Sequence, residues 1–263
     1  MPELPEVENF KNYIDETSLH QKIAAIQIAA PELLINTTID ILRDTLTGNA
    51  FEDTFRHGKF LFIRLQKNGF LMLHFGMTGD LLYYTPDKKY PKVYVLLIQF
   101  ENGRNLAFSD QRRLGKIGLV KNVESFIEDR GYGKDALKIS LEEFIVLFQK
   151  RRVAIKTALM NQKIVAGVGN EFSDEILFQS KVHPESKSNV LPLEKLKEIY
   201  QHMLAILQEA IEQNADRNKL EHYFFLDHRK EGLKCPECKG ETKLRTIGGR
   251  SSYFCPSCQK LYT

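Results

Sequence analysis

The chain has 263 residues, of which 43% are hydrophobic and 27% charged, so it has the composition of a globular protein with room for two domains. No apolar run approaches the roughly 18 residues of a membrane span, and acidic residues stand where a signal peptide is positively charged, so we expect neither membrane insertion nor export. The net charge of +3 says little, but residues 104–156 and 216–263 are rich in lysine and arginine, which suits either a phosphate backbone or a solvated surface.

The first six residues, Met1 to Glu6, carry two prolines and two glutamates. A methionine aminopeptidase removes a Met that precedes a small residue, which would leave Pro2 with a free secondary amine. Such an amine is partly neutral near pH 7 to 8 and can attack an aldehyde-level carbon to form an iminium, with Glu3 beside it to move protons. The same residues also suit the first turn of a helix. This stretch alone leaves both interpretations open.

From about residue 22 to residue 123 the chain consists of short β-rich runs separated by turn residues. Four such runs stand out, at 24–28, 60–65, 70–75 and 93–98. Their pattern predicts a mainly antiparallel sandwich of two sheets. Residues 31–46 have mixed periodicity, so a helical insertion there remains an alternative.

Helical patterns replace the strands after about residue 134, where we place a domain boundary. Ser140 and Glu143 form a capping-box pattern ahead of apolar residues at helical spacing. Three further elements are expected: a helix at 152–161, a glycine turn at 166–169 with a helix opening at Asn170, and a long amphipathic helix at 193–211.

All four cysteines lie in the last 29 residues, as two Cys-x2-Cys pairs with 16 residues between them: Cys235, Cys238, Cys255 and Cys258. This spacing is typical of a tetrahedral zinc site with each pair on a tight turn. Four protein ligands close the coordination shell, so the predicted single Zn²⁺ is structural and stabilises the segment between the pairs as a hairpin. Arg250 near the tip of that hairpin is either a solvated charge or a phosphate contact.

Five segments, at residues 1–8, 57–59, 109–115, 161–171 and 249–256, span the chain. Together and in this order they resemble the formamidopyrimidine-DNA glycosylase/endonuclease VIII family of base-excision repair enzymes, and the formamidopyrimidine branch in particular. No single segment is specific, but their joint occurrence is. Because proteins share folds without sharing function, each residue still needs its own account.

The resemblance implies an enzyme that is both a DNA glycosylase and an abasic-site lyase. Pro2 would attack the C1′ carbon of a damaged nucleotide and expel the base, and the resulting iminium would permit strand cleavage by β/δ-elimination. Glu3 would protonate the sugar ring oxygen and later shuttle protons. Glu6 would support the first helix and the pocket, and Lys59 would bind a phosphate at the catalytic site, although a lysine at a strand edge can also simply extend into solvent.

The same resemblance implies how the enzyme grips DNA once the base has left the stack. Met77 would fill the hole, although the end of a β-rich run also suits a core methionine. Arg112 would contact the base opposite the lesion, and Leu114 would wedge between base steps where the family usually has an aromatic. Asn170 would cap the helix that it opens and bind a phosphate there, and Arg250 would clamp another.

We therefore expect an α+β protein of three domains. Residues 1–133 would form an N-terminal helix and an antiparallel β-sandwich, 134–228 a helical helix–two-turn–helix domain, and 229–263 a zinc-ribbon β-hairpin. The expected partner is double-stranded DNA with a damaged base or an abasic site, bound by a monomer. The expected location is the bacterial cytoplasm, in association with the nucleoid.

Two features bear on the substrate. Leu4 is typical of the purine-repair branch, but residues 213–228 contain no glycine, whereas 8-oxoguanine enzymes of the family usually carry a glycine-rich loop there. The hypothesis is a formamidopyrimidine-type enzyme of altered or broadened specificity, in which the cover over the flipped base and the opposite-base preference remain open. The alternatives are an endonuclease VIII-like enzyme for oxidised pyrimidines, and a zinc-ribbon protein that binds damaged DNA without cutting it.

Overall fold

The computed structural model describes residues 2–87, 93–216, 219 and 224–263. The chain divides into two compact units. Unit 1 contains Pro2 and Glu6–Arg130, and unit 2 contains Glu3–Pro5 and Gly131–Thr263. Helix α1 (Leu4–Thr17) therefore begins with residues of unit 2 and continues in unit 1. The three domain ranges expected from the sequence stay predictions.

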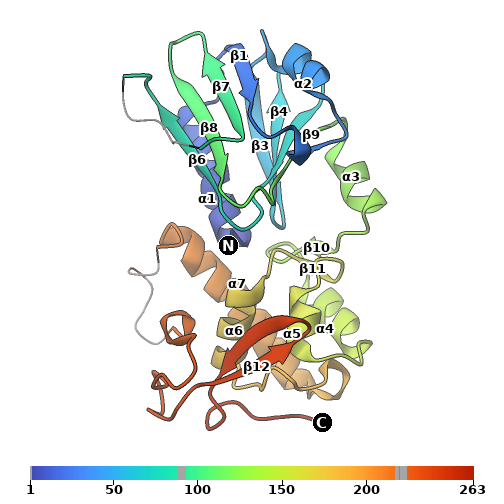
Figure 1. The fold of residues 1–263 in the computed structure, drawn as a ribbon. Helices are drawn as coiled ribbons and strands as arrows, with labels where there is room; N and C mark the ends of the chain where they lie inside the picture. Colours follow the sequence, from blue (N-terminus) through green and yellow to red (C-terminus); the bar gives the residue numbers. More distant parts are fainter. Residues whose placement is uncertain (1, 88–92, 217–218, 220–223) are drawn as a thin grey trace. The chain divides into compact units, whose positions relative to one another are not determined.

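Unit 1 is a sandwich of two sheets that lie face to face (Figure 1). One sheet has the antiparallel order β1 (Ile23–Ile28), β7 (Leu96–Phe100), β8 (Asn105–Asp110), β6 (Gly79–Tyr84). The other has the order β2 (Leu34–Ile35), β9 (Lys116–Val120), β5 (Phe70–His74), β4 (Phe60–Leu65), β3 (Phe51–His57), and only the short β2 pairs in parallel. The predicted sandwich is confirmed.

The insertion predicted as an alternative at 31–46 is helical, with a 3-10 turn at Pro31–Leu33 and helix α2 (Ile39–Leu46), which Thr38 caps.

The strand predicted at 93–98 lies two to three residues further along the chain, as β7 (Leu96–Phe100). β7 instead runs to Phe100, because the tight turn that joins it to β8 begins only after that residue: Gly103 lies at φ +80° and the Phe100 N–H donates to Arg104 O.

The core of unit 1 follows the period-two alternation of its strands. Leu61 and Ile63 of β4 and Ile98 of β7 are buried between the sheets. Helix α1 covers this core with its apolar stripe, in which Phe10 stacks on Phe75 with ring centroids 4.3 Å apart. Helix α3 (Val123–Asp129) packs Phe126 edge-on against aromatic rings of β4.

Unit 2 is built around helix α7 (Leu193–Glu212), which buries Leu196, Ile199, Met203 and Leu207 at three- and four-residue spacing. The other helices are α4 (Leu141–Gln149), α5 (Ile155–Met160) and α6 (Asn170–Gln179), with the short parallel pair β10 (Lys134–Asp135) and β11 (Val165–Ala166). The long helix and the helix opening at Asn170 are confirmed, and so is the capping box of Ser140 and Glu143.

The helix expected at 152–161 is shorter than predicted. Its first turn is not helical because Ala154 forms a β-bridge with Lys187 and the N–H of Ile155 donates to Ser186 O at 2.7 Å. Those backbone groups are therefore already used, and α5 begins at Ile155.

The zinc-ribbon hairpin of unit 2 consists of β12 (Lys243–Ile247) and β13 (Arg250–Phe254), and β13 contacts α6 (Figure 1). The hypothesis about a cover over the flipped base concerns the segment 213–228, of which residues 217–218 and 220–223 lie outside the described part of the chain. Within the described residues, no helix combines the length and apolarity needed to cross a membrane.

Candidate functional site

Glu3 is almost completely buried, with 1% of its surface exposed. Its carboxylate accepts the N–H of Gly169 at 2.5 Å and the N–H of Glu171 at 2.9 Å, and next to it the N–H of Leu4 donates to Gly167 O at 3.2 Å. These hydrogen bonds join the N-terminal segment to the turn before α6. The carboxylate that follows Pro2 is therefore held at the positive end of a helix.

This arrangement corrects the predicted cap of α6. The N-cap position is occupied by Gly169 without a side-chain cap, and Asn170 is the first helical residue. The prediction of an Asn170 cap was wrong because Glu3, 166 residues away in the chain, accepts the N–H groups that a cap would accept. Asn170 Oδ1 is buried and has no hydrogen-bond partner within the described residues, so its amide is not used for capping.

Pro2 is half-buried and directly precedes the anchored Glu3, and Glu6 is half-buried in the first turn of α1. In unit 1, Lys59 lies in the tight turn between β3 and β4, not on a strand. The buried Arg56 fastens this turn, since it pairs with Glu8 of α1 and donates to Gly58 O at 3.1 Å.

His74 was not singled out from the sequence. It ends β5 and lies in register between Phe60 of β4 and Lys116 of β9, at the same end of the sheet as the turn that carries Lys59. Burial, with repulsion from Lys59 and Lys116, lowers the pKa of His74 to about 4. Its Nδ1 accepts the N–H of Gly76 at 3.2 Å, so the neutral ring carries its proton on Nε2.

Two loops continue from the same end of the sandwich, since Gly79 at the start of β6 pairs with Asp110 at the end of β8. Met77 on one loop is 40% exposed, and Leu114 on the other is 46% exposed. Arg112 is also exposed. Met77 is thus a surface residue, not the core methionine that its strand-end position also allowed.

A buried group of charges in unit 2 was likewise not foreseen. Asp174 of α6 accepts hydrogen bonds from Lys156 of α5, from Arg229 Nε at 3.0 Å, and from Ser252 Oγ at 3.1 Å and the Tyr253 N–H at 3.2 Å, both in β13. Burial lowers the pKa of Lys156, although the Asp174 carboxylate opposes that shift. This charge cluster joins α5, α6 and the hairpin.

Arg250 is exposed and is the first residue of β13. It pairs with Ile247, so the hairpin turn has only the two residues Gly248 and Gly249, at φ +57° and +74°. A two-residue turn with positive φ at both positions is type I′, which glycine adopts without strain. Arg250 therefore lies directly beside the hairpin turn, near the tip where the sequence predicted it.

The four cysteines meet at one point. Their sulfur atoms all lie within 4.8 Å of one another, with Cys235 Sγ 3.8 Å from Cys258 Sγ and Cys238 Sγ 3.5 Å from Cys255 Sγ. Zn–S bonds of about 2.3 Å in a tetrahedron place the sulfur atoms about 3.8 Å apart, so these residues fit one zinc ion.

The pKa values of the thiols show that protons compete with the zinc ion for the sulfur atoms. Burial, reinforced by the neighbouring thiols, raises the pKa of Cys258 well above its usual range, whereas the Gly240 N–H lowers the pKa of Cys238 to about 7. Binding of Zn²⁺ must therefore displace protons from the cluster.

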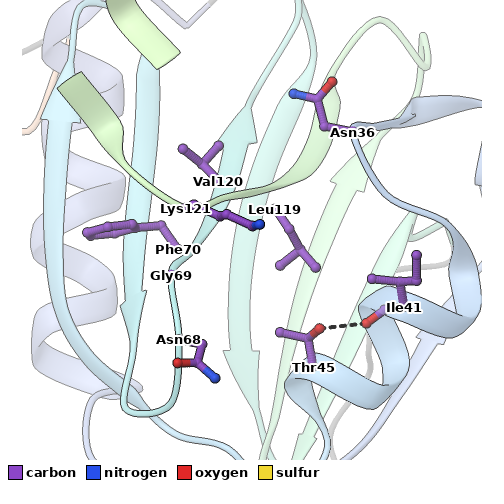
Figure 2. Close-up of a pocket in the computed structure, with 9 residues that line it drawn as sticks. All are labelled: Asn36, Ile41, Thr45, Asn68, Gly69, Phe70, Leu119, Val120 and Lys121. Carbon is purple, nitrogen blue, oxygen red and sulfur yellow. Dashed lines mark hydrogen bonds between the residues drawn. The ribbon is translucent and has the colours of Figure 1, made fainter. Parts of the chain in front are cut away.

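A surface pocket of about 600 Å³ lies elsewhere in unit 1, between α2, the start of β5 and the end of β9 (Figure 2). It is lined by Ile41, Thr45, Phe70 and Lys121 among others. Phe70 pairs with Val120 at the far end of the sheet from His74, so this pocket is separate from the residues described above.

Comparison with known proteins assigns the family. Residues 1–117 match the formamidopyrimidine-DNA glycosylase N-terminal domain, residues 133–221 the formamidopyrimidine-DNA glycosylase H2TH domain, and residues 232–261 a zinc finger found in FPG and IleRS. The formamidopyrimidine-DNA glycosylase of Mycoplasma mobile is 32% identical over 99% of this chain and 100% of its own. That of Desulforamulus reducens is 30% identical over 99% of each chain.

Solved structures agree. A complex of Lactococcus lactis Fpg with DNA that contains an abasic site has a TM-score of 0.90 and 27% identity, covering 98% of this chain and 100% of that one. A complex of MutM with DNA that contains carbocyclic 8-oxo-G has a TM-score of 0.89 and 28% identity, with the same coverage. The predicted resemblance, fold class and zinc site are thereby confirmed, and the chain belongs to the formamidopyrimidine-DNA glycosylase family.

Proposed function

We propose that this protein is a DNA glycosylase and abasic-site lyase that removes an oxidised base through an iminium at Pro2. The Pro2 nitrogen forms a bond to C1′ while the bond from C1′ to the base breaks, and the base leaves with a proton. Glu3 protonates the ring oxygen as the base leaves, so the sugar opens in the same step and the bond between Pro2 and C1′ becomes the iminium. The iminium acidifies the C2′ protons, so loss of one expels the 3′ phosphate by β-elimination. Loss of the C4′ proton from the conjugated product then expels the 5′ phosphate by δ-elimination.

The anchoring of Glu3 carries this proposal. A glutamate that only favoured the dipole of α1 would be exposed in its first turn. Instead, two N–H groups at the start of α6 hold the buried carboxylate beside the residue whose amine would react. Substrate-positioning residues fixed in this way avoid the entropic cost of ordering a side chain during the reaction.

Four side chains are proposed to bind phosphates: Lys59, His74, Asn170 and Arg250. His74 extends the set expected from the sequence, because a neutral imidazole with its proton on Nε2 donates one hydrogen bond without needing a counter-charge. Met77, Arg112 and Leu114 would occupy the space left by the flipped base and face its former partner. Glu6 is proposed to support α1.

The proposed substrate is a formamidopyrimidine-type purine lesion in double-stranded DNA, bound by a monomer in a bacterial cytoplasm. The name of the relatives and their bacterial sources support this proposal. The alternative is excision of oxidised pyrimidines, as by an endonuclease VIII-like enzyme. Duplexes with formamidopyrimidine, 8-oxoguanine, thymine glycol and 5-hydroxycytosine separate the two substrate classes.

Incubation with a duplex that contains an abasic site, followed by borohydride, is expected to trap a covalent adduct at residue 2. Mass spectrometry of the intact protein confirms that Met1 has been removed, and peptide mapping locates the adduct. Pro2→Gly is expected to form about tenfold less adduct, because its primary amine is not held by a ring and gives a neutral imine that must first be protonated, whereas proline gives the iminium directly. The matched control is Pro31→Gly, at the 3-10 turn. An absence of adduct from correctly processed protein would leave only damage recognition without cutting.

Removal of zinc, by a chelator or by Cys238→Ser, is expected to weaken DNA binding by roughly 10- to 100-fold, the worth of one or two charge-assisted contacts. The reason is that the four cysteines fix the hairpin that carries Arg250. None of these zinc ligands lies in unit 1, so the sandwich is expected to stay folded when the ion is removed. Fluorescence anisotropy with labelled DNA measures the affinity, and circular dichroism measures unfolding. Ser257→Ala, between two of the cysteines, is the control. Loss of all cooperative unfolding would contradict this division of roles.

A further inference from the structure

A single buried carboxylate joins the two loops that carry Met77, Arg112 and Leu114. Asp110 is fully buried at the end of β8. Its Oδ1 accepts the hydroxyl of Thr78 at 2.5 Å, and its Oδ2 accepts the N–H groups of Leu114 at 2.8 Å and Gly115 at 2.7 Å. One end of this carboxylate therefore holds the Met77 loop and the other holds the Leu114 loop.

Thr78 makes a second link between the loops. Its hydroxyl donates to Asp110 and also accepts the N–H of Arg112 at 3.0 Å. The hydroxyl thus fixes the residue next to Met77 and the backbone of Arg112 at the same time. Hydrogen bonds to an ionised carboxylate are roughly twice as strong as neutral ones, so the links through Asp110 are the stronger ones, and the Arg112–Thr78 bond adds a neutral link between the same loops.

Backbone packing brings the loops closer than side chains would allow. Gly76 lies at φ +59°, and a Cβ there would be 2.6 Å from both the N atom of Gly115 and the C atom of Leu114. Only glycine permits this approach. The exposed side chains of Met77 and Leu114 consequently project from two loops that are in direct contact.

Inserting side chains between stacked bases costs a few kcal/mol per step. A flexible loop would move aside instead of separating the bases, and ordering it on binding would also cost conformational entropy. Loops that are already ordered by the protein avoid both losses. A single DNA strand has no paired base to separate, so acting on it does not require ordered loops.

We propose that Thr78 and Asp110 are positioning residues that clamp the two loops into one rigid wedge for everting the damaged base from duplex DNA. Neither side chain touches the reacting atoms; both act through Met77, Arg112 and Leu114. The clamp rests on the proposed function, and it adds a requirement that concerns duplex substrates specifically.

Thr78→Val keeps the shape of the side chain and removes both hydrogen bonds of the hydroxyl. It is expected to lower the single-turnover rate of excision from a duplex by roughly 10- to 100-fold. The yield of borohydride adduct on a single-stranded abasic oligonucleotide is expected to change less than about twofold. 2-Aminopurine beside the lesion reports unstacking, and its fluorescence rise is expected to be slower by the same factor. Thr78→Ser, which restores the hydroxyl, is expected to recover the excision rate.

The control is Thr54→Val, because the Thr54 hydroxyl also donates to a carboxylate, that of Asp15 on α1, away from the two loops. It is expected to leave duplex excision within about twofold of the wild type. Equal losses on duplex and single strand for Thr78→Val would overturn the clamp, as would an unchanged duplex rate. If the wild type forms no borohydride adduct on the single strand and none on the abasic duplex either, the proposed function fails and the clamp with it.

Discussion

Glu3→Gln is expected to lower the rate of base excision by about 10²- to 10⁴-fold, the usual contribution of a positioned general acid or base. The amide has nearly the same shape, so it occupies the same buried space, but it cannot give and take protons in the same way. One of its ends also carries an NH₂ group, which cannot accept the N–H of Gly169 or Glu171. A smaller loss of stability is therefore expected as well, about 1–3 kcal/mol for one unsatisfied donor.

Two measurements separate these effects. Single-turnover excision on a damaged duplex reports the proton transfers, and borohydride trapping on a preformed abasic site reports attack by Pro2, which needs no leaving base. Excision is expected to fall far more than trapping. Glu171→Gln is a control on the neighbouring helix position, since the Glu171 side chain pairs with Arg229. Equal losses of excision and trapping would mean that Glu3 serves only to fasten the N-terminal segment.

The parts of the fold that were predicted correctly are those with a strong local signal. The β4 run, at 60–65, is apolar except for Arg64 and lies between turns, and its bounds were correct. The capping box of Ser140 needs only residues three apart in the chain. By contrast, β8 was not singled out, because Asn105, Ser109 and Asp110 interrupt its apolar pattern. That strand is specified by its neighbours β7 and β6, which local propensity does not reveal.

The candidate site shows the same division. Cysteine spacing was sufficient to predict the zinc cluster, and the turn glycines to place Arg250 at the hairpin tip. The roles of Asp110 and Asp174 could not be foreseen, because a buried carboxylate and a solvated one look alike in a sequence. The buried carboxylates differ from solvated ones because they accept hydrogen bonds from residues far away in the chain. Ser252, for example, lies 78 residues from Asp174.

Asp174→Asn is expected to lower the free energy of unfolding of unit 2 by about 3–5 kcal/mol. The substitution removes the negative charge that faces Lys156 and Arg229, whose side chains are 0% and 10% exposed. Two cations would then remain close together in a region shielded from water. Ser252 and Tyr253 would also lose an acceptor, so the hairpin would be held less firmly at a point two residues beyond Arg250. Weaker DNA binding is expected to accompany the loss of stability.

Denaturant unfolding followed by circular dichroism is the suitable measurement, because the chain has no tryptophan. The control is Glu194→Gln on α7, which breaks an exposed pair with Lys197 and is expected to cost no more than about 1 kcal/mol. Lys156→Met should cost less than Asp174→Asn, since it removes a buried charge and leaves Asp174 paired with Arg229. If Asp174→Asn unfolds like the Glu194 variant, then the charge cluster does not hold the hairpin against α6, and apolar contacts such as those of Phe178 and Phe225 do.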